Sequence, residues 1–367
     1  MIDVNSGHFD IPVVETTGFK MIDVSRASIS STKFCVTRNY LPSNTKMKIT
    51  VLIPTYNYAH YIVEAIDKTL AQATKNFEIE VLVIDDGSTD NTHGVLQYLI
   101  ESNKICYAYQ QNQGKAAATR KGIALATGKY IFNLDADDYF LPNKIQAFVN
   151  AFETYPSVIH VGSAAKVIDA TGKHLSTENI PTEWADKPVN GLALATFFLK
   201  NNTLWAGGTT YAARADVLKT LVIPDGVDMY LDEYLILGIL NHGDSFCFKG
   251  PLSIWRVHGN NYSNTTPEQA QIKNKRSLKS SKNTLEALKK HSKLPEELLK
   301  LYAFKHQTRL IASLEDTNQK SLGNIWEYSK KMWTLKDEGV AFFKRYTAFN
   351  RLLPTPILHF AKNLLGR

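Results

Sequence analysis

Cysteine is scarce in this sequence, which holds only Cys35, Cys106 and Cys247 among its 367 residues. The three are widely separated, and no CxxC motif or Cys/His cluster accompanies them. A disulfide framework and a structural zinc site both require sets of cysteines at defined spacings, so the sequence favours neither. We therefore expect a reducing, cytoplasmic compartment.

Long apolar runs are missing as well. No stretch of about 18 uninterrupted apolar residues occurs, which argues against a membrane-spanning helix. The N-terminal region includes Asp3, Asp10 and Glu15 and lacks the basic-then-apolar pattern of a secretion signal. We expect neither a membrane span nor secretion by that route.

Acidic residues are in modest deficit. The 42 Lys and Arg residues exceed the 35 Asp and Glu residues by a net charge of +7, which favours anionic partners such as nucleotides, acidic glycans or membrane surfaces. The basic residues carry no nucleic-acid-binding motif, so we expect no nucleic-acid partner. With 44% hydrophobic and 21% charged residues, the chain is typical of a globular protein with one domain plus additional segments, or two domains.

Short apolar runs alternate with helical periods between Lys48 and Asp138. The expected strands are 49–53, 79–84, 105–109 and 130–134, and the expected helices are 60–72, 91–102 and 115–126. This alternation predicts βαβ units and a mostly parallel sheet that helices cover on both faces. Ligands of such sheets bind beyond the carboxyl ends of the strands.

The pattern is looser outside this region. The expected elements after Asp138 are a helix over 142–154, a strand over 157–169, irregular chain through Trp205, a helix over 231–241 and a strand over 246–255. We divide the chain into an N-terminal arm or small β element over 1–46, an α/β domain over 47–264, and a helical, basic C-terminal appendage over 265–367.

Polar residues follow three of the expected strands. Residues 54–57 (Pro-Thr-Tyr-Asn) follow the first strand, 85–90 (Asp-Asp-Gly-Ser-Thr-Asp) the second and 135–138 (Asp-Ala-Asp-Asp) the fourth. Asp135 and Asp137 are two residues apart, so on extended backbone their carboxylates point the same way and can share a divalent cation with a diphosphate. Taken alone, this motif also fits an ordinary acidic loop.

In their order, these motifs resemble those of family 2 glycosyltransferases of the GT-A type over about residues 49–263. The resemblance is carried by 51–57, 83–90, Gly114 with Lys115, 128–130, the pair Asp135 and Asp137, and 255–258 (Trp-Arg-Val-His). It implies an α/β, Rossmann-like GT-A fold. It also implies an inverting transferase that moves a sugar from a nucleotide donor, first of all a UDP-sugar, to a saccharide or lipid-linked saccharide.

The resemblance implies a nucleotide site. Tyr56 offers an aromatic face to a uracil-like base, Asp86 an acceptor to its imide N–H, and Lys115 a cation to phosphate. The alternatives are core packing for Tyr56, a turn or helix-cap carboxylate for Asp86, and a solvated surface position for Lys115. The implied nucleotide-binding residues are Pro54, Tyr56, Asn57, Asp86, Lys115, Asp135 and Arg256.

A divalent cation, Mn²⁺ or Mg²⁺, is implied as well. Asp137 and His258 match its ligands, and Asp135 would hold the ribose or a metal-bound water. Arg256 would contact the diphosphate and offset the charge of the leaving group. A lone histidine is more often structural, but His258 stands in an ordered series of motifs.

Inverting transfer needs one carboxylate that removes the proton of the acceptor hydroxyl. The family supplies an acidic pair on a helix, and here Asp232 and Glu233 stand in the reversed order. In the family a glycine follows the base by eleven positions, and Gly243 lies eleven after Asp232 but ten after Glu233. We assign Asp232 as the base and Glu233 as its reserve, with two solvated acids at a helix N-terminus as the alternative.

The acceptor is expected at a loop that contains Trp205, Gly207 and Gly208. Aromatic rings stack on sugar faces, so Trp205 is either an acceptor platform or a core residue. The C-terminal region is basic, with eight Lys or Arg and two acids in 267–293, and with five basic residues and no acids in 340–367. Such a region favours peripheral contact with the inner face of a membrane or, equally, a packing or oligomerisation element.

Two other functions share parts of this pattern. A sugar nucleotidyltransferase would have a Gly-rich phosphate loop after its first strand, where this chain has Pro-Thr-Tyr-Asn at 54–57. A non-catalytic nucleotide-binding scaffold would lack the metal and base acids, which are present.

Overall fold

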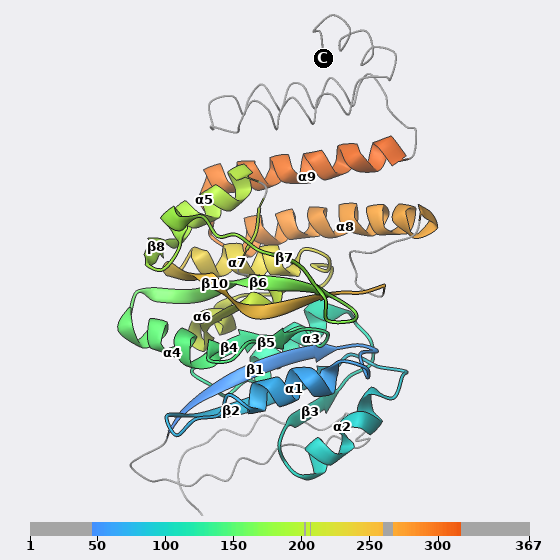
Figure 1. The fold of residues 1–367 in the computed structure, drawn as a ribbon. Helices are drawn as coiled ribbons and strands as arrows, with labels where there is room; N and C mark the ends of the chain where they lie inside the picture. The colour runs from blue at the N-terminus through green and yellow to red at the C-terminus, as the bar shows by residue number, and fades with distance from the viewer. Residues whose placement is uncertain (1–45, 202, 206, 260–266, 317–367) are drawn as a thin grey trace, which may run out of the picture. The chain divides into compact units, whose positions relative to one another are not determined.

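The computed structural model describes residues 46–201, 203–205, 207–259 and 267–316 (Figure 1). Residues 1–45 of the expected N-terminal arm and the basic stretch 340–367 lie outside the described residues.

Four parallel strands form the first half of the sheet. They are β1 (Met47–Thr55), β2 (Phe77–Asp85), β3 (Cys106–Tyr109) and β4 (Tyr130–Asn133), in the order β3-β2-β1-β4. The helices between them are α1 (Ile62–Leu70), α2 (Thr92–Glu101) and α3 (Lys115–Leu125). The predicted βαβ units are confirmed, because each element lies at its expected position and the strands pair in parallel.

The second half of the sheet mixes parallel and antiparallel pairs. It consists of β5 (Tyr139–Phe140), α4 (Lys144–Thr154), β6 (Val158–Asp169), β9 (Tyr211–Arg214) and β10 (Asp244–Val257). β9 lies antiparallel between β4 and β6, whereas β10 runs parallel to β6 and antiparallel to β5. The strand order therefore continues β4-β9-β6-β10-β5.

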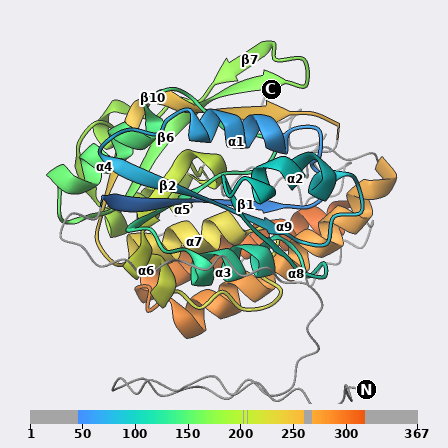
Figure 2. The same cartoon turned by 90° about the horizontal axis from the view of Figure 1, so that it is seen from below.

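Helices cover both faces of the sheet. Successive residues of a strand point to opposite faces. Val51 of β1 therefore packs with Ile49 and Ile53 in one cluster, together with apolar residues of α1, α2 and α4. Leu52 points the other way and packs in a second cluster with residues of α3, α6 (Ala215–Thr220) and α7 (Leu231–Leu240). Figure 2 shows α1 and α4 on one side of β1 and β2, and α3, α6 and α7 on the other.

The Gly-Lys-Tyr motif at 128–130 has a structural cause. A Cβ on Gly128 would lie 2.4 Å from the backbone nitrogen of Thr50, which is closer than real Cβ atoms approach. The N–H of Gly128 also donates to Thr50 Oγ1 at 2.9 Å. Glycine is therefore required where the chain enters β4 beside β1.

The prediction of irregular chain between 169 and Trp205 is wrong. This segment contains β7 (His174–Thr177), the 3-10 turn η1 (Thr182–Trp184), β8 (Pro188–Asn190) and α5 (Gly191–Asn201). α5 begins where Asn190 Oδ1 accepts the N–H of Ala193 at 3.0 Å. Its sequence is apolar on most sides because it packs against α7 and α9 (Glu296–Asp316), so no helical period reveals it.

Helices α8 (Pro267–His291) and α9 make up the described part of the predicted helical C-terminal region. Leu288, Leu301 and Tyr302 are buried in the same cluster as Leu235 of α7, so the two helices extend the core of the sheet domain. The division of the chain into an arm (1–46), an α/β domain (47–264) and a C-terminal appendage (265–367) stays a prediction. Within the residues that the structure describes, none of the helices has the length and apolar character needed to cross a bilayer.

Candidate functional site

Three charged side chains meet beyond the carboxyl ends of β1 and β4. Lys115 opens α3, Asp135 follows β4, and Asp232 lies in the first turn of α7. Lys115 Nζ is 2.8 Å from Asp135 Oδ1 and 4.0 Å from Asp232 Oδ2. The structure thus brings together the residues predicted for phosphate, ribose and proton transfer. We call them the Lys115 cluster.

Charge within the Lys115 cluster shifts its proton affinities. Burial raises the pKa of Asp232, and Asp135 raises it further, although Lys115 acts to lower it. Burial lowers the pKa of Lys115, but the Asp135 and Asp232 carboxylates outweigh burial and raise it. An aspartate with a raised pKa binds a proton more readily than an ordinary one, which is the property of a general base.

The 3-10 turn η2 (Gly208–Thr210) borders the Lys115 cluster. Gly208 has a φ of +52°, which L residues rarely adopt, and its N–H donates to Asp232. A Cβ on Gly208 would lie 3.5 Å from Asp135 Oδ2 and 3.8 Å from Asp232 Oδ2. Gly208 therefore keeps a side chain away from the two carboxylates, whereas a Cβ on Gly207 would lie 3.7 Å from the Asp232 Cβ.

A buried acid–imidazole pair joins the loop after β4 to the end of β10. Asp137 Oδ2 and His258 Nε2 are 3.1 Å apart, with side chains 11% and 4% exposed. The His258 ring packs on Tyr61, with ring centroids 4.9 Å apart. Burial raises the pKa of Asp137, and the nearby Asp135 carboxylate raises it further. A buried carboxylate that lacks full compensation favours a nearby cation.

This pair is an incomplete metal site on its own. Among the described residues, no group of three or more His, Cys, Asp or Glu side chains is arranged to hold a metal ion. Mg²⁺ in nucleotide enzymes is commonly bound through one or two carboxylates together with substrate phosphates and water. Asp137 matches the carboxylate of that pattern and His258 would add an imidazole nitrogen, while the remaining ligands would come with the nucleotide.

Arg256 supports the acidic loop from within. Its backbone N–H donates to Asp138 Oδ1 at 2.8 Å, and its Nε donates to the Asp137 carbonyl at 3.1 Å. Its guanidinium also pairs with Glu64 of α1 at 2.6 Å, and its side chain is 8% exposed. The predicted contact of Arg256 with a diphosphate finds no support in this geometry, because protein groups bind the buried guanidinium.

The loop after β1 contains one exposed ring and one residue that ties loops together. Tyr56 is 44% exposed, so the core-packing alternative is wrong for it. Asn57 Oδ1 accepts the N–H groups of Thr89 and Asp90 at 2.7 and 3.2 Å, which joins the loops after β1 and β2. Pro54 is buried within β1. Of these predicted nucleotide residues, Tyr56 and Asn57 are exposed and Pro54 is buried.

Asp86 anchors the turn that leads into α3. Its Oδ1 accepts from Gln110 Nε2 at 2.7 Å and from the Gln113 N–H at 3.0 Å, and its Oδ2 accepts from the Gly114 N–H at 2.7 Å. The residue is 3% exposed. The structure therefore agrees with a turn carboxylate, which fixes the position of Lys115, rather than with an acceptor for a base.

The two acids of α7 lie in different surroundings. Asp232 belongs to the Lys115 cluster, whereas Glu233 Oε1 pairs with Lys305 Nζ at 2.8 Å and with Arg309 at 2.7 Å, both on α9. Burial acts to raise the pKa of Glu233, but Lys305 and Arg309 outweigh it and lower the pKa. Glu233 is placed as a structural acid, away from Asp135.

Trp205 is a core residue. It is 6% exposed and packs on Phe197 and Phe198 of α5, with ring centroids 5.3 and 4.8 Å apart. Stacking of Trp205 on an acceptor sugar is therefore wrong for this structure, and the packing alternative holds.

Two supporting residues are not evident from the sequence. Thr209 Oγ1 donates to Asp138 and accepts the Asp135 N–H at 3.2 Å. Lys144 Nζ donates to the Thr209 carbonyl and to Ser253 Oγ, each at 2.6 Å. Lys144 is fully buried, and burial holds its pKa well below the usual range. Its only sequence signal is its position four residues before Phe148 on the apolar stripe of α4.

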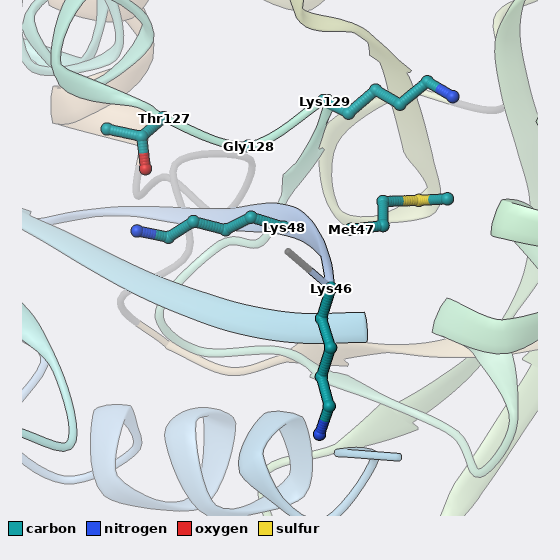
Figure 3. Close-up of a pocket in the computed structure, with 6 residues that line it drawn as sticks. All are labelled: Lys46, Met47, Lys48, Thr127, Gly128 and Lys129. Carbon is teal, nitrogen blue, oxygen red and sulfur yellow. The ribbon is translucent and has the colours of Figure 1, made fainter. Parts of the chain in front are cut away.

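A pocket of about 470 Å³ lies at the opposite end of β1. Its lining residues are Lys46, Met47, Lys48, Thr127, Gly128 and Lys129. In Figure 3 the three lysine side chains point away from one another, and Lys48 and Lys129 pair with Glu80 and Glu153 at 3.3 and 2.7 Å. The pocket lacks converging polar groups, so the Lys115 cluster remains the candidate site.

Solved structures share this fold. TarS 1–349 from S. aureus, determined in complex with UDP-GlcNAc, is 17% identical with a TM-score of 0.55, and the match covers 86% of this chain and 88% of that one. The mannosyltransferase PcManGT from Pyrobaculum calidifontis, in complex with GDP-Man and Mn²⁺, is 17% identical with a TM-score of 0.50 over 88% of both chains. These similarities confirm the predicted GT-A α/β fold.

Sequence comparisons identify the family. An uncharacterized glycosyltransferase from Nostoc sp. is 34% identical over 221 residues, which is 59% of this chain and 66% of that protein. The chain spans only 21% and 23% of the length of two Rickettsia relatives. Residues 50–221 match the family described as Glycosyl transferase family 2. Through this region, the chain belongs to glycosyl transferase family 2.

Proposed function

We propose that this protein is a metal-dependent, inverting glycosyltransferase. It moves a sugar from a nucleotide-sugar, in the first place a UDP-sugar, to a hydroxyl of a saccharide or lipid-linked saccharide. The observation that carries the proposal is the position of Asp232, which lies with Lys115 and Asp135 beside the glycine turn. Proton transfer beside an anion-binding cation is the chemistry that this reaction requires. A non-catalytic scaffold requires no such base.

The donor binds beyond the carboxyl ends of β1 and β4. The exposed Tyr56 ring stacks on the base, and Lys115 binds the diphosphate at the N-terminus of α3, which no side chain caps. No acid lies in the first turn of α3 to compete with the diphosphate. Asp135 accepts from the ribose. The nucleotide-sugars bound to TarS and PcManGT support this class of donor, in which UDP is our first expectation.

A divalent cation, Mn²⁺ or Mg²⁺, fits beside the donor diphosphate. Asp137 and His258 would hold it, with Asp135 nearby. Burial and the Asp135 carboxylate raise the pKa of Asp137, so a cation beside this carboxylate would be favourable. When bound, the cation supplies charge that stabilises a nucleoside diphosphate leaving group. Arg256 holds the Asp137 backbone in place through its hydrogen bond to the carbonyl.

Asp232 is the base of the transfer step. It takes the proton of the acceptor hydroxyl as that oxygen forms a bond to the anomeric carbon. The bond between the anomeric carbon and the phosphate oxygen breaks, and its electron pair leaves with the nucleoside diphosphate. Because the hydroxyl attacks the face opposite the leaving group, the configuration inverts. Gly207 and Gly208 leave room for the acceptor beside Asp232.

Peripheral membrane contact would bring a lipid-linked acceptor to this site. Lys275, Lys279 and Lys282 of α8 are exposed, and the basic region 340–367 follows farther along the chain. Anionic lipids attract such residues. Deletion of 340–367 should move the protein from the membrane fraction to the soluble fraction, and unchanged fractionation would reject this contact.

Calorimetric titration tests the donor class and the metal together. UDP, GDP and dTDP are titrated with Mn²⁺ or Mg²⁺ into the wild type, Asp137→Ala, and the matched control Asp67→Ala, which changes an exposed acid of α1. We expect metal-dependent binding of UDP that Asp137→Ala abolishes and the control retains. Absence of binding to all three nucleotides would reject the proposed donor site, whereas binding that Asp137→Ala leaves unchanged would favour the non-catalytic nucleotide-binding scaffold.

A further inference from the structure

The segment that leads into α7 is held by the C-terminal helices. Gly226 and Asp228 precede α7, and Tyr230 is its N-terminal flanking residue. Asn283 Nδ2 donates to the Gly226 carbonyl at 3.1 Å, and the Asp228 N–H donates to Ser280 Oγ at 3.1 Å. Both partners belong to α8, so this helix binds the backbone of the segment directly.

Charged and aromatic contacts add to these backbone contacts. Arg276 of α8 donates from two nitrogens to the Asp228 carboxylate, and the bond from Nη2 to Oδ1 is 2.9 Å long. Tyr230 Oη lies 2.6 Å from Ser277 Oγ, also on α8. From α9, the Arg309 guanidinium lies 3.4 Å from the centre of the Tyr230 ring. Residues 226–230 are thus bound from both C-terminal helices.

Glu233 completes the attachment inside α7 itself. It pairs with Lys305 and Arg309, and the three side chains are only 12–15% exposed. Ion pairs with so little solvent contact hold their geometry, because breaking one leaves a buried charge without a partner. Asp232 precedes Glu233 by one residue, so fixing the rotation of the first turn at Glu233 fixes the direction of Asp232.

At the N-terminus of α7 the Leu231 N–H donates to the Asp228 carbonyl at 3.2 Å, but no side chain caps the helix. The helix is apolar over most of its length. The first turn of a helix leaves backbone N–H groups without intrahelical partners and frays readily unless it is held. Arg309 reaches both Tyr230 and Glu233, which flank Asp232 in the sequence.

We infer that α8 and α9 position the catalytic base, with Arg309 and Arg276 as positioning residues that hold residues 226–233 so that Asp232 lies beside Asp135. The inference rests on the proposed function, because it concerns the base of that reaction. The region matched by the family ends at residue 221, before any of these contacts. A small displacement of a base relative to the acceptor hydroxyl lowers the rate without weakening donor binding.

The experiment compares Arg309→Met with Lys300→Met in the full chain. Lys300 also lies on α9, but its ion pair with Glu296 at 3.5 Å is exposed. Three quantities are measured for each variant: kcat and KM for the donor, the Kd of the nucleotide by calorimetry, and the hydrogen–deuterium exchange of amides in 226–233. Circular dichroism and the Tm report whether each variant folds.

For Arg309→Met we expect kcat to fall about tenfold or more, nucleotide Kd to stay within about twofold, and exchange in 226–233 to accelerate. Lys300→Met should change none of these. Unchanged exchange overturns the inference, and so does faster exchange with wild-type kcat, because the helices would then hold the segment without serving the base.

A second variant decides the case in which Arg309→Met does not fold. Arg276 is half exposed, so Arg276→Met should fold and still release Asp228. A fall in kcat of at least about threefold with faster exchange supports the inference, and wild-type kcat overturns it. Failure of the proposed function looks different: the wild type itself then binds no nucleotide and transfers no sugar, while the exchange difference between Arg309→Met and Lys300→Met persists.

Discussion

Asp232 and Glu233 are neighbours in α7, yet they lie in opposite electrostatic environments. Asp232 is 35% exposed, contacts one lysine and faces a second carboxylate, and burial together with Asp135 raises its pKa. Glu233 is 14% exposed and contacts two cations, which lower its pKa despite its burial. The difference lies in the number of opposite charges. Asp232, with one lysine at 4.0 Å, binds a proton more readily than an ordinary aspartate. Glu233, with two cations in contact, stays ionised and serves packing.

The largest expected effect comes from Asp232→Asn, which removes the proposed base without changing the shape of the side chain. We expect kcat to fall by about 10²–10⁴, the range in which general base catalysis contributes. Nucleotide affinity should remain at the wild-type level. Initial-rate kinetics and calorimetry measure the two quantities. A variant that keeps more than about half of the wild-type kcat would show that Asp232 is not the base.

Glu233→Gln removes the negative charge that pairs with Lys305 and Arg309. Lys305 and Arg309 would be left close together without a negative partner, so we expect a loss of about 3–5 kcal/mol in the free energy of unfolding. Urea denaturation at pH 7 measures this loss. The control is Glu296→Gln, whose side chain is 78% exposed and whose loss should stay below about 1 kcal/mol. Equal losses in the two variants would contradict the structural role of Glu233.

The Glu233 contribution to stability depends on pH with a definite sign. Its pKa is lower in the folded protein than the ordinary value of 4.5, so its contribution is complete above that value. The contribution is lost as the pH falls through the folded pKa. Glu233→Gln should therefore remove part of the acid sensitivity of the wild type. Parallel stability curves for the two proteins between neutral and acidic pH would contradict this expectation.

Much of the sheet could be predicted because apolar patterning reports burial directly. The runs that form β1 and β2 are buried on both faces, and the polar residues after them lie where parallel strands end. Lys115 and Asp135 lie together at that edge, and the resemblance had implied a nucleotide role for each of them. α5 was missed because a helix covered by α7 and α9 needs no polar face.

Several side chains are held by protein partners that the local sequence pattern does not reveal. Asp86 accepts hydrogen bonds from residues 24–28 positions later, and Glu233 pairs with Arg309, 76 positions later. Trp205 looked suited to a sugar but is covered by α5. Lys144 belongs to a residue type that is usually exposed, yet it is buried. A local pattern specifies which groups are available, but the fold decides which of them are already bound.

Lys115→Met tests whether Lys115 lowers the pKa of Asp232. Lys115 is the group that lowers the Asp232 pKa against burial and Asp135, so its removal should raise that pKa further. The acidic limb of the kcat–pH profile should then move to higher pH, because a base must be deprotonated to act. Lys121→Met, on the same helix, is the control, since Lys121 donates to the Tyr109 carbonyl. An acidic limb that stays in place would place the titrating base elsewhere.

The smallest expected effect belongs to Lys282→Met, which tests whether burial or pairing makes the Glu233 contacts important. Lys282 and Glu286 form an ion pair at 3.9 Å with side chains 66% and 64% exposed. Water and salt screen such a pair, so its loss should change the free energy of unfolding by less than about 0.5 kcal/mol at moderate salt. Urea denaturation at two salt concentrations measures this. If Lys282→Met lowered the free energy of unfolding as much as Glu233→Gln does, pairing of opposite charges alone would determine the stability of both contacts, and burial would not matter. If it costs almost nothing, exclusion of water from Lys305 and Arg309 is what turns their pairing with Glu233 into a rigid support for Asp232, the proposed base.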